Sequence, residues 1–480
     1  MSQTGQTGRT SETADWTDPK PARVTFDEWL ELFDHVPDEL IEHYHYYDNG
    51  ESWSKYLFPP QTFAIYGARH LRRLKFDNSL AALRMWGLVQ NETERLFRAR
   101  QIGRRVIATM GDLGAVPVIV DSFPGCVAFY PDCIWWTPFV MESRVLFDAA
   151  AELGIGDATC FSRAALGAFA KHSYFPDPDL VIASTGASCD DYSGVEQLVQ
   201  SFAPDVLWVE EPLRQECRIA SDECRMGVPR ETQAAITFLT REYERVVERM
   251  ERLAGHAITE EELREGVRRA NRVRKLVARL RELTFRDAAL AALEMMVVEF
   301  GSLHYYSDIG EWTAVLEHLL ATAERRAARA ERVVDGAALR IIWVTPPADP
   351  LLLTYVEDKG ARVVGTEYVI NQALEVMDES RPPLEAIADS FMAASLIGTS
   401  RARAESVIGQ ARERQAEGVI ISGILGGSHC AMEARLISDY VKQEMGLPVL
   451  EFDVAPPSNE VGLQLQTRID AFLEVLRSRR

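Results

Sequence analysis

Short runs of apolar, mostly β-branched residues recur in the first half of the chain, and segments with helical spacing separate most of them. Four such runs span residues 105–109, 116–120, 180–183 and 206–209. Each is four or five residues long, as expected for strands buried on both faces of a parallel sheet. The pattern predicts an α/β domain over residues 105–230.

A second series of apolar runs follows in the last third of the chain. These runs lie at residues 339–344, 361–364, 418–422 and 448–452. They again alternate with helix-like segments, so we expect a second α/β domain over residues 336–480. The predicted fold class is therefore α/β, with two doubly wound parallel-sheet domains.

The residues between the two series, 231–335, have the spacing of helices rather than strands. Apolar residues recur there at alternating steps of three and four. Gly255 is placed to end a first long helix, and Thr259 with Glu262 forms a capping-box pattern that opens a second. We expect a helical hairpin here, followed by a linking helix over the arginine-rich residues 323–332.

The N-terminal part divides into a polar tail, residues 1–22, and a segment with helical spacing, residues 23–104. We expect the second to form a helical layer. The tail lacks the apolar stretch of a signal peptide, which predicts a cytoplasmic location. The most apolar helix, residues 288–300, contains Glu294 and Glu299 and is too short to span a bilayer.

Composition is that of an ordinary folded protein. The 480 residues are 47% hydrophobic and 26% charged, and 52 basic against 72 acidic residues give a net charge of 52 − 72 = −20. Such an acidic chain is not expected to bind nucleic acid or an anionic membrane surface.

Several familiar catalytic motifs are absent from the sequence. It contains no GxxxxGK[ST] loop for ATP, no GxSxG nucleophile elbow, no HExxH and no CxxC. The glycines at Gly154 and Gly156 lack the third glycine of a dinucleotide-binding fingerprint, so we interpret them as a turn. These absences argue against a P-loop ATPase, a serine hydrolase and a zinc protease.

Three of the seven cysteines occupy similar places. Cys189 and Cys430 follow predicted strands through glycine-containing loops, and both precede predicted helices, as Cys160 does. Ligands of open α/β sheets collect beyond the carboxyl ends of strands, and a helix N-terminus favours a thiolate. No disulfide framework is expected in a cytoplasmic chain with seven cysteines.

The three cysteines allow more than one interpretation. Thiolates spaced this way could hold an iron-sulfur cluster closed across a domain cleft. A zinc site with His429 as a fourth ligand is an alternative. The simplest alternative is that each cysteine is a small buried apolar residue.

Four segments resemble one family. The strings "GDATCFSRAALGAF", "DLVIASTGASCDDYSGVEQLV", "GVIISGILGGSHCAMEARLISDY" and "TRIDAFLEVL" are similar to those of the 2-hydroxyacyl-CoA dehydratase and benzoyl-CoA reductase family. The resemblance covers the chain from Leu74 to its C-terminus, in order. It is most specific at the three cysteines and in the last of these strings.

The resemblance implies two flavodoxin-like domains with a 4Fe-4S cluster in the cleft between them. Cys160, Cys189 and Cys430 would be its ligands and would leave one iron free. The substrate would be an acyl-CoA thioester, dehydrated or reduced by radical chemistry. A separate ATP-dependent activator would deliver the electron, and a homologous second subunit would complete the enzyme. The resemblance leaves open whether the reaction is dehydration or reduction of an aromatic ring.

The sequence departs from the family between residues 110 and 139, where the usual Pro-Glu-Leu step is missing. Substrate-pocket and CoA-binding residues are therefore not assigned. Cys126 and Cys133 lie in this stretch. They could support a second metal centre, as in the double-cubane reductases of the family, or simply pack in the core. Cys217 and Cys224 are interpreted as bystanders.

No catalytic acid or base is named from the sequence. Several residues could supply protons near the cleft: His172, Asp190, His304, Tyr305, Tyr306 and Glu433. A core or surface role is the alternative for each of them. A non-enzymatic, metal-stabilised binding protein of the same fold is the remaining alternative for the whole chain.

Overall fold

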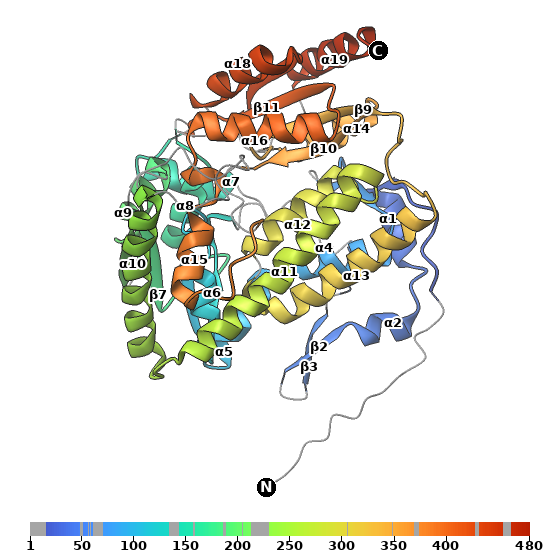
Figure 1. Ribbon diagram of the computed structural model, residues 1–480. Helices are drawn as coiled ribbons and strands as arrows, with labels where there is room; N and C mark the ends of the chain where they lie inside the picture. Colours follow the sequence, from blue (N-terminus) through green and yellow to red (C-terminus); the bar gives the residue numbers. More distant parts are fainter. Residues whose placement is uncertain are drawn as a thin grey trace.

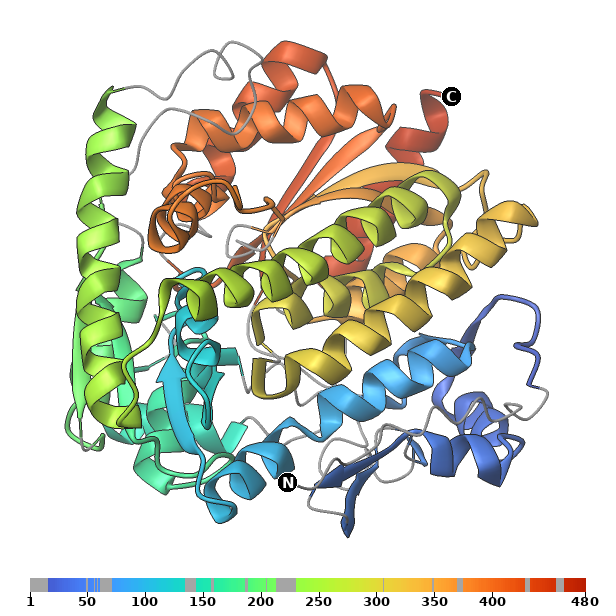
Figure 2. The same cartoon turned by 60° about the horizontal axis from the view of Figure 1, so that its bottom comes forward.

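The structure is a computed structural model. It describes residues 16–48, 51–55, 57, 59–60, 71–133, 144–156, 159–185, 189–203, 205–212, 230–304, 306–347, 349–368, 374–427, 432–454 and 462–480. Two α/β domains and a set of long helices between them make up most of the molecule (Figures 1 and 2).

The first sheet has four parallel strands in the order β6-β5-β7-β8. The strands are β5 (Arg105–Thr109), β6 (Cys126–Phe129), β7 (Leu180–Thr185) and β8 (Val206–Glu210). The strands predicted at residues 105–109, 180–183 and 206–209 are confirmed. In sequence order this arrangement is 2-1-3-4, which is the flavodoxin-like pattern.

The strand predicted at residues 116–120 is wrong. Residues Val116–Asp121 form a short helix, α6, with Pro117 in its first turn. Proline is favoured there because its fixed φ suits a helix start, where its missing N–H removes no helical bond. Every residue from Val116 to Val120 is buried, so the apolar run alone could not separate helix from strand. The strand beside β5 is instead Cys126–Phe129.

The second sheet repeats the same topology with the order β10-β9-β11-β12. Its parallel strands are β9 (Leu339–Val344), β10 (Ala361–Glu367), β11 (Gly418–Ile424) and β12 (Val449–Val454). All four predicted strands are confirmed. The central strand β11 is buried along its whole length, as its continuous apolar sequence indicates.

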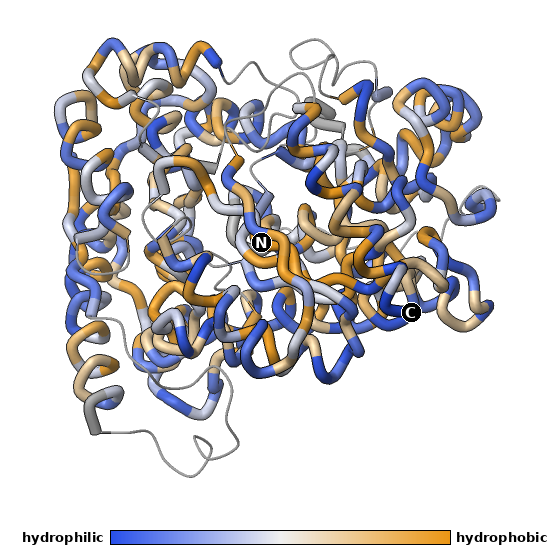
Figure 3. The backbone as a smooth tube through the Cα atoms, turned by 90° about the horizontal axis from the view of Figure 1, so that it is seen from above, coloured by the Kyte–Doolittle hydropathy of each residue, from blue (hydrophilic) through white to orange (hydrophobic). Residues whose placement is uncertain are grey.

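Helices cover both sheets. Those of the first domain are α6, α7 (Arg144–Glu152), α8 (Arg163–Lys171) and α9 (Asp190–Val199). Those of the second are α14 (Leu351–Asp358), α15 (Pro383–Phe391), α16 (Ser400–Glu413), α18 (Ala434–Met445) and α19 (Leu463–Ser478). Hydrophilic and hydrophobic stretches alternate along the outer helices, as amphipathic helices require (Figure 3).

The region between the sheets contains four helices: α10 (Arg230–Ala254), α11 (Glu260–Asp287), α12 (Ala292–His304) and α13 (Ile309–Ala328). Gly255 has a φ of 65° after α10, and Thr259 with Glu262 forms the predicted capping box of α11. α10 and α11 then diverge, so the hairpin is open (Figure 1). The linking helix expected over residues 323–332 is the C-terminal part of α13, which ends at Ala328, four residues earlier than predicted.

The N-terminal layer is less purely helical than the sequence predicts. Its helices are α1 (Phe26–Phe33), α2 (Asp38–His43), α4 (Leu80–Gln90) and α5 (Glu92–Gln101). β1 (Arg23–Thr25) pairs antiparallel with β4 (Lys75–Asp77), and β2 (His45–Asp48) with β3 (Glu51–Lys55). The pair β1–β4 joins segments about fifty residues apart in the chain, a contact that helical periodicity cannot reveal.

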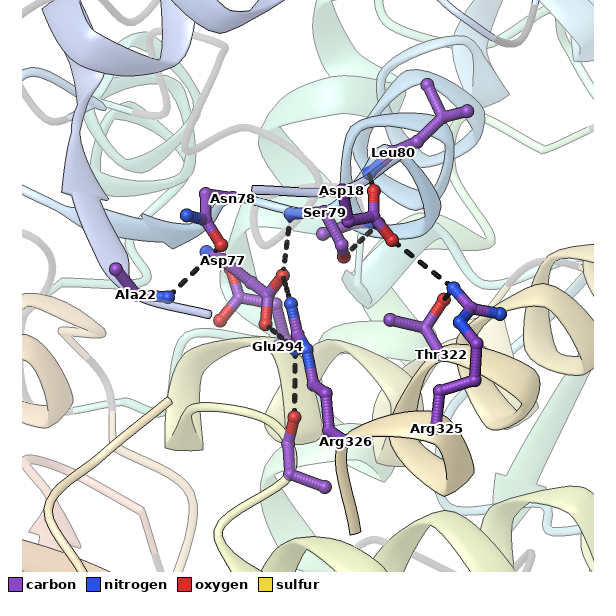
Figure 4. Close-up of polar contacts among 12 residues, drawn as sticks. Asp18, Ala22, Asp77, Asn78, Ser79, Leu80, Glu294, Thr322, Arg325 and Arg326 are labelled. Carbon is purple, nitrogen blue, oxygen red and sulfur yellow. Dashed lines mark hydrogen bonds and ion pairs between the residues drawn. The ribbon is translucent and has the colours of Figure 1, made fainter. Parts of the chain in front are cut away.

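The two glutamates that interrupt the apolar helix α12 are fully buried. Glu294 Oε1 accepts hydrogen bonds from Asp77 N (3.0 Å) and Trp86 Nε1 (3.3 Å), and burial raises the pKa of Glu294 to about 8. Asp77 in turn binds Arg326 through both carboxylate oxygens (Figure 4). This network ties the N-terminal layer to α12 and α13. No helix in the described part of the chain has the length and apolar character needed to cross a membrane.

Candidate functional site

The structure brings two of the three predicted cysteine ligands to one edge of the first domain. Cys189 is buried and is the N-cap residue of α9, four residues after the carboxyl end of β7. Cys160 lies three residues before α8. The helix α8 packs against α9, and the Asp191 carboxylate in the first turn of α9 raises the pKa of the Cys160 thiol.

The environment of Cys160 corrects one expectation from the sequence. Burial raises the pKa of its thiol to about 11, although the backbone N–H groups of Ser162 and Phe161 act in the opposite direction. A helix N-terminus was expected to favour the thiolate, but desolvation has the larger effect here. A bound metal ion would reverse the balance, because coordination deprotonates a thiol.

A buried arginine supports the loop that carries Cys160. The Arg163 guanidinium donates to the carbonyl oxygens of Thr159 and Cys160, and it lies 4.7 Å above the ring centre of Phe147 on α7. Arg163 is only 1% exposed. These contacts fix the loop against the helix pair α7–α8.

Cys189 is positioned from its backbone. The Ser193 N–H donates to the Cys189 carbonyl oxygen (3.3 Å). The Ser193 hydroxyl oxygen lies 3.4 Å from the same carbonyl and 3.2 Å from the Ser184 carbonyl in β7. The start of α9 is thereby connected to the end of the strand that precedes it.

The third predicted ligand, Cys430, and its neighbour His429 lie outside the described residues. The elements on either side are described. β11 ends at Ile424, and Gly426 has a φ of 82° in the turn that follows. Beyond the gap, Glu433 binds the buried Arg403 at 2.7 Å, and Arg403 also binds Glu367 through two hydrogen bonds of 2.9 and 2.7 Å.

Cys126 and Cys133 do not lie together. Cys126 is the first residue of β6, while Cys133 ends a short 3₁₀ helix (Pro131–Cys133) beyond the other end of that strand. The strand alone spans about 10 Å between them. Burial raises the pKa of Cys126 to about 11, consistent with a packing role. Cys217 and Cys224 fall outside the described residues.

The described contacts do not support a proton-donor role for most of the residues considered from the sequence. His172 is exposed and its Nδ1 lies 2.9 Å from Asp177 at the surface. Asp190 is exposed at the start of α9. Tyr305 and the side chains of His304 and Tyr306 lie outside the described part of the structure.

A group of buried polar residues at the same sheet edge was not predicted. Asp112 follows β5, Ser184 lies in β7, Glu196 is on α9 and Glu211 follows β8; each is 5% exposed or less. The signal was present in the sequence, since a polar residue within three positions of a buried strand's carboxyl end lies where ligands collect.

Comparison with known proteins identifies the family. A sequence model of that family, described as "2-hydroxyglutaryl-CoA dehydratase, D-component", matches residues 138–476. This chain belongs to the 2-hydroxyglutaryl-CoA dehydratase D-component family. A relative in Escherichia coli (strain K12), described as "Putative dehydratase subunit YjiM", is 23% identical over 319 residues, which is 64% of this chain and 76% of the relative.

The family match contains Cys160, Cys189 and Cys430 and excludes the N-terminal layer and the strands β5 and β6. As a dehydratase-family subunit, the chain is part of an enzyme that works with other subunits. Among the described residues, no three His, Cys, Asp or Glu side chains are placed to hold a metal ion. The third cysteine of the predicted site is not among those residues.

Proposed function

We propose that this chain is the iron-sulfur subunit of a 2-hydroxyacyl-CoA dehydratase, with a 4Fe-4S cluster held by Cys160, Cys189 and Cys430. The observation that carries the proposal is that Cys160 shortly precedes α8 and Cys189 caps α9, two helices that pack against each other. Dehydration is favoured over ring reduction because the family and the bacterial relative are both described as dehydratases.

The residues around Cys160 suit such a cluster. Thiolates are the usual ligands of iron-sulfur clusters, and hydrogen bonds to sulfur tune their potentials. The backbone N–H groups of Phe161 and Ser162 lower the pKa of the Cys160 thiol and so favour its thiolate. Cys189 is buried and Cys160 is partly buried, which limits the access of water to a bound cluster.

In this proposal the protein binds, orients and shields, while the bound cluster would supply one-electron chemistry toward an acyl-CoA thioester. Arg163 would hold the Cys160 loop, and Arg403 would hold the segment that follows Cys430 through Glu433. A separate ATP-dependent activator would provide the electron, as the family resemblance implies; the absence of a P-loop in this sequence is compatible with it. A homologous second subunit would complete the enzyme.

The test is anaerobic purification and reconstitution, followed by iron and sulfide analysis and EPR spectroscopy. We expect about four irons per chain in the wild type, as for one 4Fe-4S cluster, and loss of most of the iron in Cys160→Ser, Cys189→Ser and Cys430→Ser. Cys126→Ser is the matched control and should keep its iron, because Cys126 begins β6 and so lies at the amino ends of the parallel strands, whereas Cys189 follows the carboxyl end of β7.

The outcomes separate the alternatives. A reconstituted wild type without iron would refute the cluster. Iron that survives all three substitutions would refute the ligand assignment. About eight irons per chain would instead indicate a double-cubane centre.

A further inference from the structure

The buried carboxyl groups at the edge of the first sheet occupy a special place in its topology. The chain passes from β5 to β6 on one side and later returns to β7 on the other side of β5. The gap between β5 and β7 is therefore the switch point at which doubly wound sheets bind ligands. Asp112 and Ser184 meet across this gap.

The hydrogen bonds of Ser184 bear on the protonation of the two carboxyl groups around it. Its hydroxyl oxygen lies 2.5 Å from Asp112 Oδ2 and 3.3 Å from Glu196 Oε2, and its backbone N–H donates to the same Glu196 oxygen at 2.9 Å. A hydroxyl group has one proton to donate. If both carboxyl groups were ionised, one of the hydroxyl contacts would have no proton. A further proton on Asp112 or Glu196 would satisfy both hydroxyl contacts at once.

A second observation points the same way. Glu211 is 5% exposed, and neither of its carboxylate oxygens has a hydrogen-bond partner among the described residues; the same holds for Glu196 Oε1. An ionised carboxylate without donors is strongly disfavoured in the interior. Burial raises the pKa of Asp112 to about 7 and raises those of Glu196 and Glu211 well above the ordinary range.

The groups that face this row from each neighbouring element are acidic or neutral. Asp132 faces Asp112 from beyond β6 and accepts a hydrogen bond from the Tyr192 hydroxyl on α9, and Tyr243 on α10 faces Glu211. Arg274 on α11 lowers the pKa of Tyr243. The raised pKa values of Asp112, Glu196 and Glu211 favour protonated carboxyl groups in such surroundings.

We propose that Asp112, Ser184 and Glu196 form a buried proton relay that serves the reaction at the Cys160–Cys189 edge of the domain. In one state Asp112 donates to the Ser184 hydroxyl, which donates to the Glu196 carboxylate. In the other state the Asp112 proton has moved to the Ser184 oxygen, and the original Ser184 proton has moved to Glu196. The Asp112 O–H and the old Ser184 O–H bonds are broken, and a new Ser184 O–H and a Glu196 O–H bond form. No electron is transferred. The role of the relay in catalysis rests on the proposed function; the existence of the relay does not.

Infrared spectroscopy of the purified chain tests whether the shared proton exists. At about pH 6, below the pKa of Asp112, the wild type should show carboxylic-acid C=O stretching, and Asp112→Asn should lose the part that titrates near neutral pH. Asp132→Asn is the matched control. Asp132 accepts from Gly111 N and the Tyr192 hydroxyl, and its charge raises the pKa of Asp112, so its substitution should keep that band and lower the pH at which it titrates.

An unchanged band in Asp112→Asn would overturn the relay. If that variant does not fold, Glu196→Gln tests the same shared proton, with the same expected loss and the same contradictory result. These measurements need neither cluster nor substrate, so their failure would leave the proposed function untouched.

The relay's service to the reaction is tested in the complete enzyme. Ser184→Ala should lower kcat by about 10²-fold or more with little change in KM, and should shift the pH profile of kcat. Ser184→Thr keeps the hydroxyl and should restore most of the rate. Iron content should be equal in all three proteins. Equal kcat values and pH profiles in wild type and Ser184→Ala would refute the role in turnover.

Discussion

At the scale of single residues, Arg403 shows how the segment after the predicted Cys430 ligand is fixed. Its side chain is fully buried and binds Glu367 and Glu433 at once. The carboxylates keep the pKa of the guanidinium above its ordinary value despite burial. A buried ion pair adds little net stability by itself, but removing one partner leaves uncompensated charge.

Arg403→Met should therefore destabilise the protein strongly, by about 3–5 kcal/mol, because two buried carboxylates would lose their counter-charge. Chemical denaturation monitored by circular dichroism measures this free energy of unfolding. Arg401→Met is the matched control, since Arg401 pairs with Glu405 on the exposed face of α16. It should change stability by about 1 kcal/mol or less. Equal losses in the two variants would contradict the expected role of Arg403.

At the scale of elements, the close packing of α7 against α8 depends on one glycine. A Cβ atom at Gly167 on α8 would lie 2.0 Å from the backbone oxygen of Leu146 on α7. Backbone cannot yield as a flexible side chain would, so the two helices would have to move apart. α8 directly follows the Cys160 loop, which connects this packing to the candidate site.

Gly167→Ala is expected to lower the free energy of unfolding by about 1–3 kcal/mol, as overpacking does, and to reduce iron retention after reconstitution. Gly409→Ala on α16 is the control, because nothing lies within 4 Å of its added Cβ. It should stabilise the protein by about 0.5–1 kcal/mol through helix propensity. A melting temperature for Gly167→Ala at or above that of the wild type would show that the helices can adjust.

The elements also show what sequence reasoning could reach. Seven of the eight predicted strands are confirmed because they are continuous apolar runs between polar turns, and Thr259 with Glu262 marks the start of α11. α6 was mistaken for a strand because its residues are all buried, which removes the periodicity that distinguishes the two. The sequence does not reveal that Asp112 and Glu196 act together, because they lie 84 positions apart in the chain and are linked only by their contacts with Ser184.

At the scale of the whole molecule, the N-terminal segment holds separate parts together. Arg23 on β1 binds Glu357 (3.4 Å) and Asp358 (2.7 Å) on α14 of the second domain. Glu357 also accepts from Ala292 N at the start of α12. Burial raises the pKa of Glu357 to about 7, with Arg23 acting in the opposite direction.

This junction predicts a pH dependence of stability. The folded Glu357 carboxyl binds its proton more tightly than the unfolded one, so its favourable contribution is complete below about pH 4.5 and is lost as the pH rises to about 7. Glu357→Gln cannot titrate. Its stability relative to the wild type should therefore increase between these pH values and then level off, as measured by denaturation at several pH values. The exposed Glu444→Gln serves as control and should show no such trend; a flat difference for Glu357→Gln would contradict the prediction.

The helix α11 touches both halves of the molecule. Near one end, a Cβ atom at Gly266 would lie 2.0 Å from the Ser122 hydroxyl oxygen next to α6, so backbone and side chain are in close contact. Near its other end, Arg281 donates to the Thr366 hydroxyl of β10 in the second sheet. A single unbroken 28-residue helix thus connects the first domain to the second sheet. Any movement of the two sheets away from each other would have to break the close contact at Gly266 or the Arg281–Thr366 hydrogen bond, so we expect the two α/β domains to keep a fixed separation.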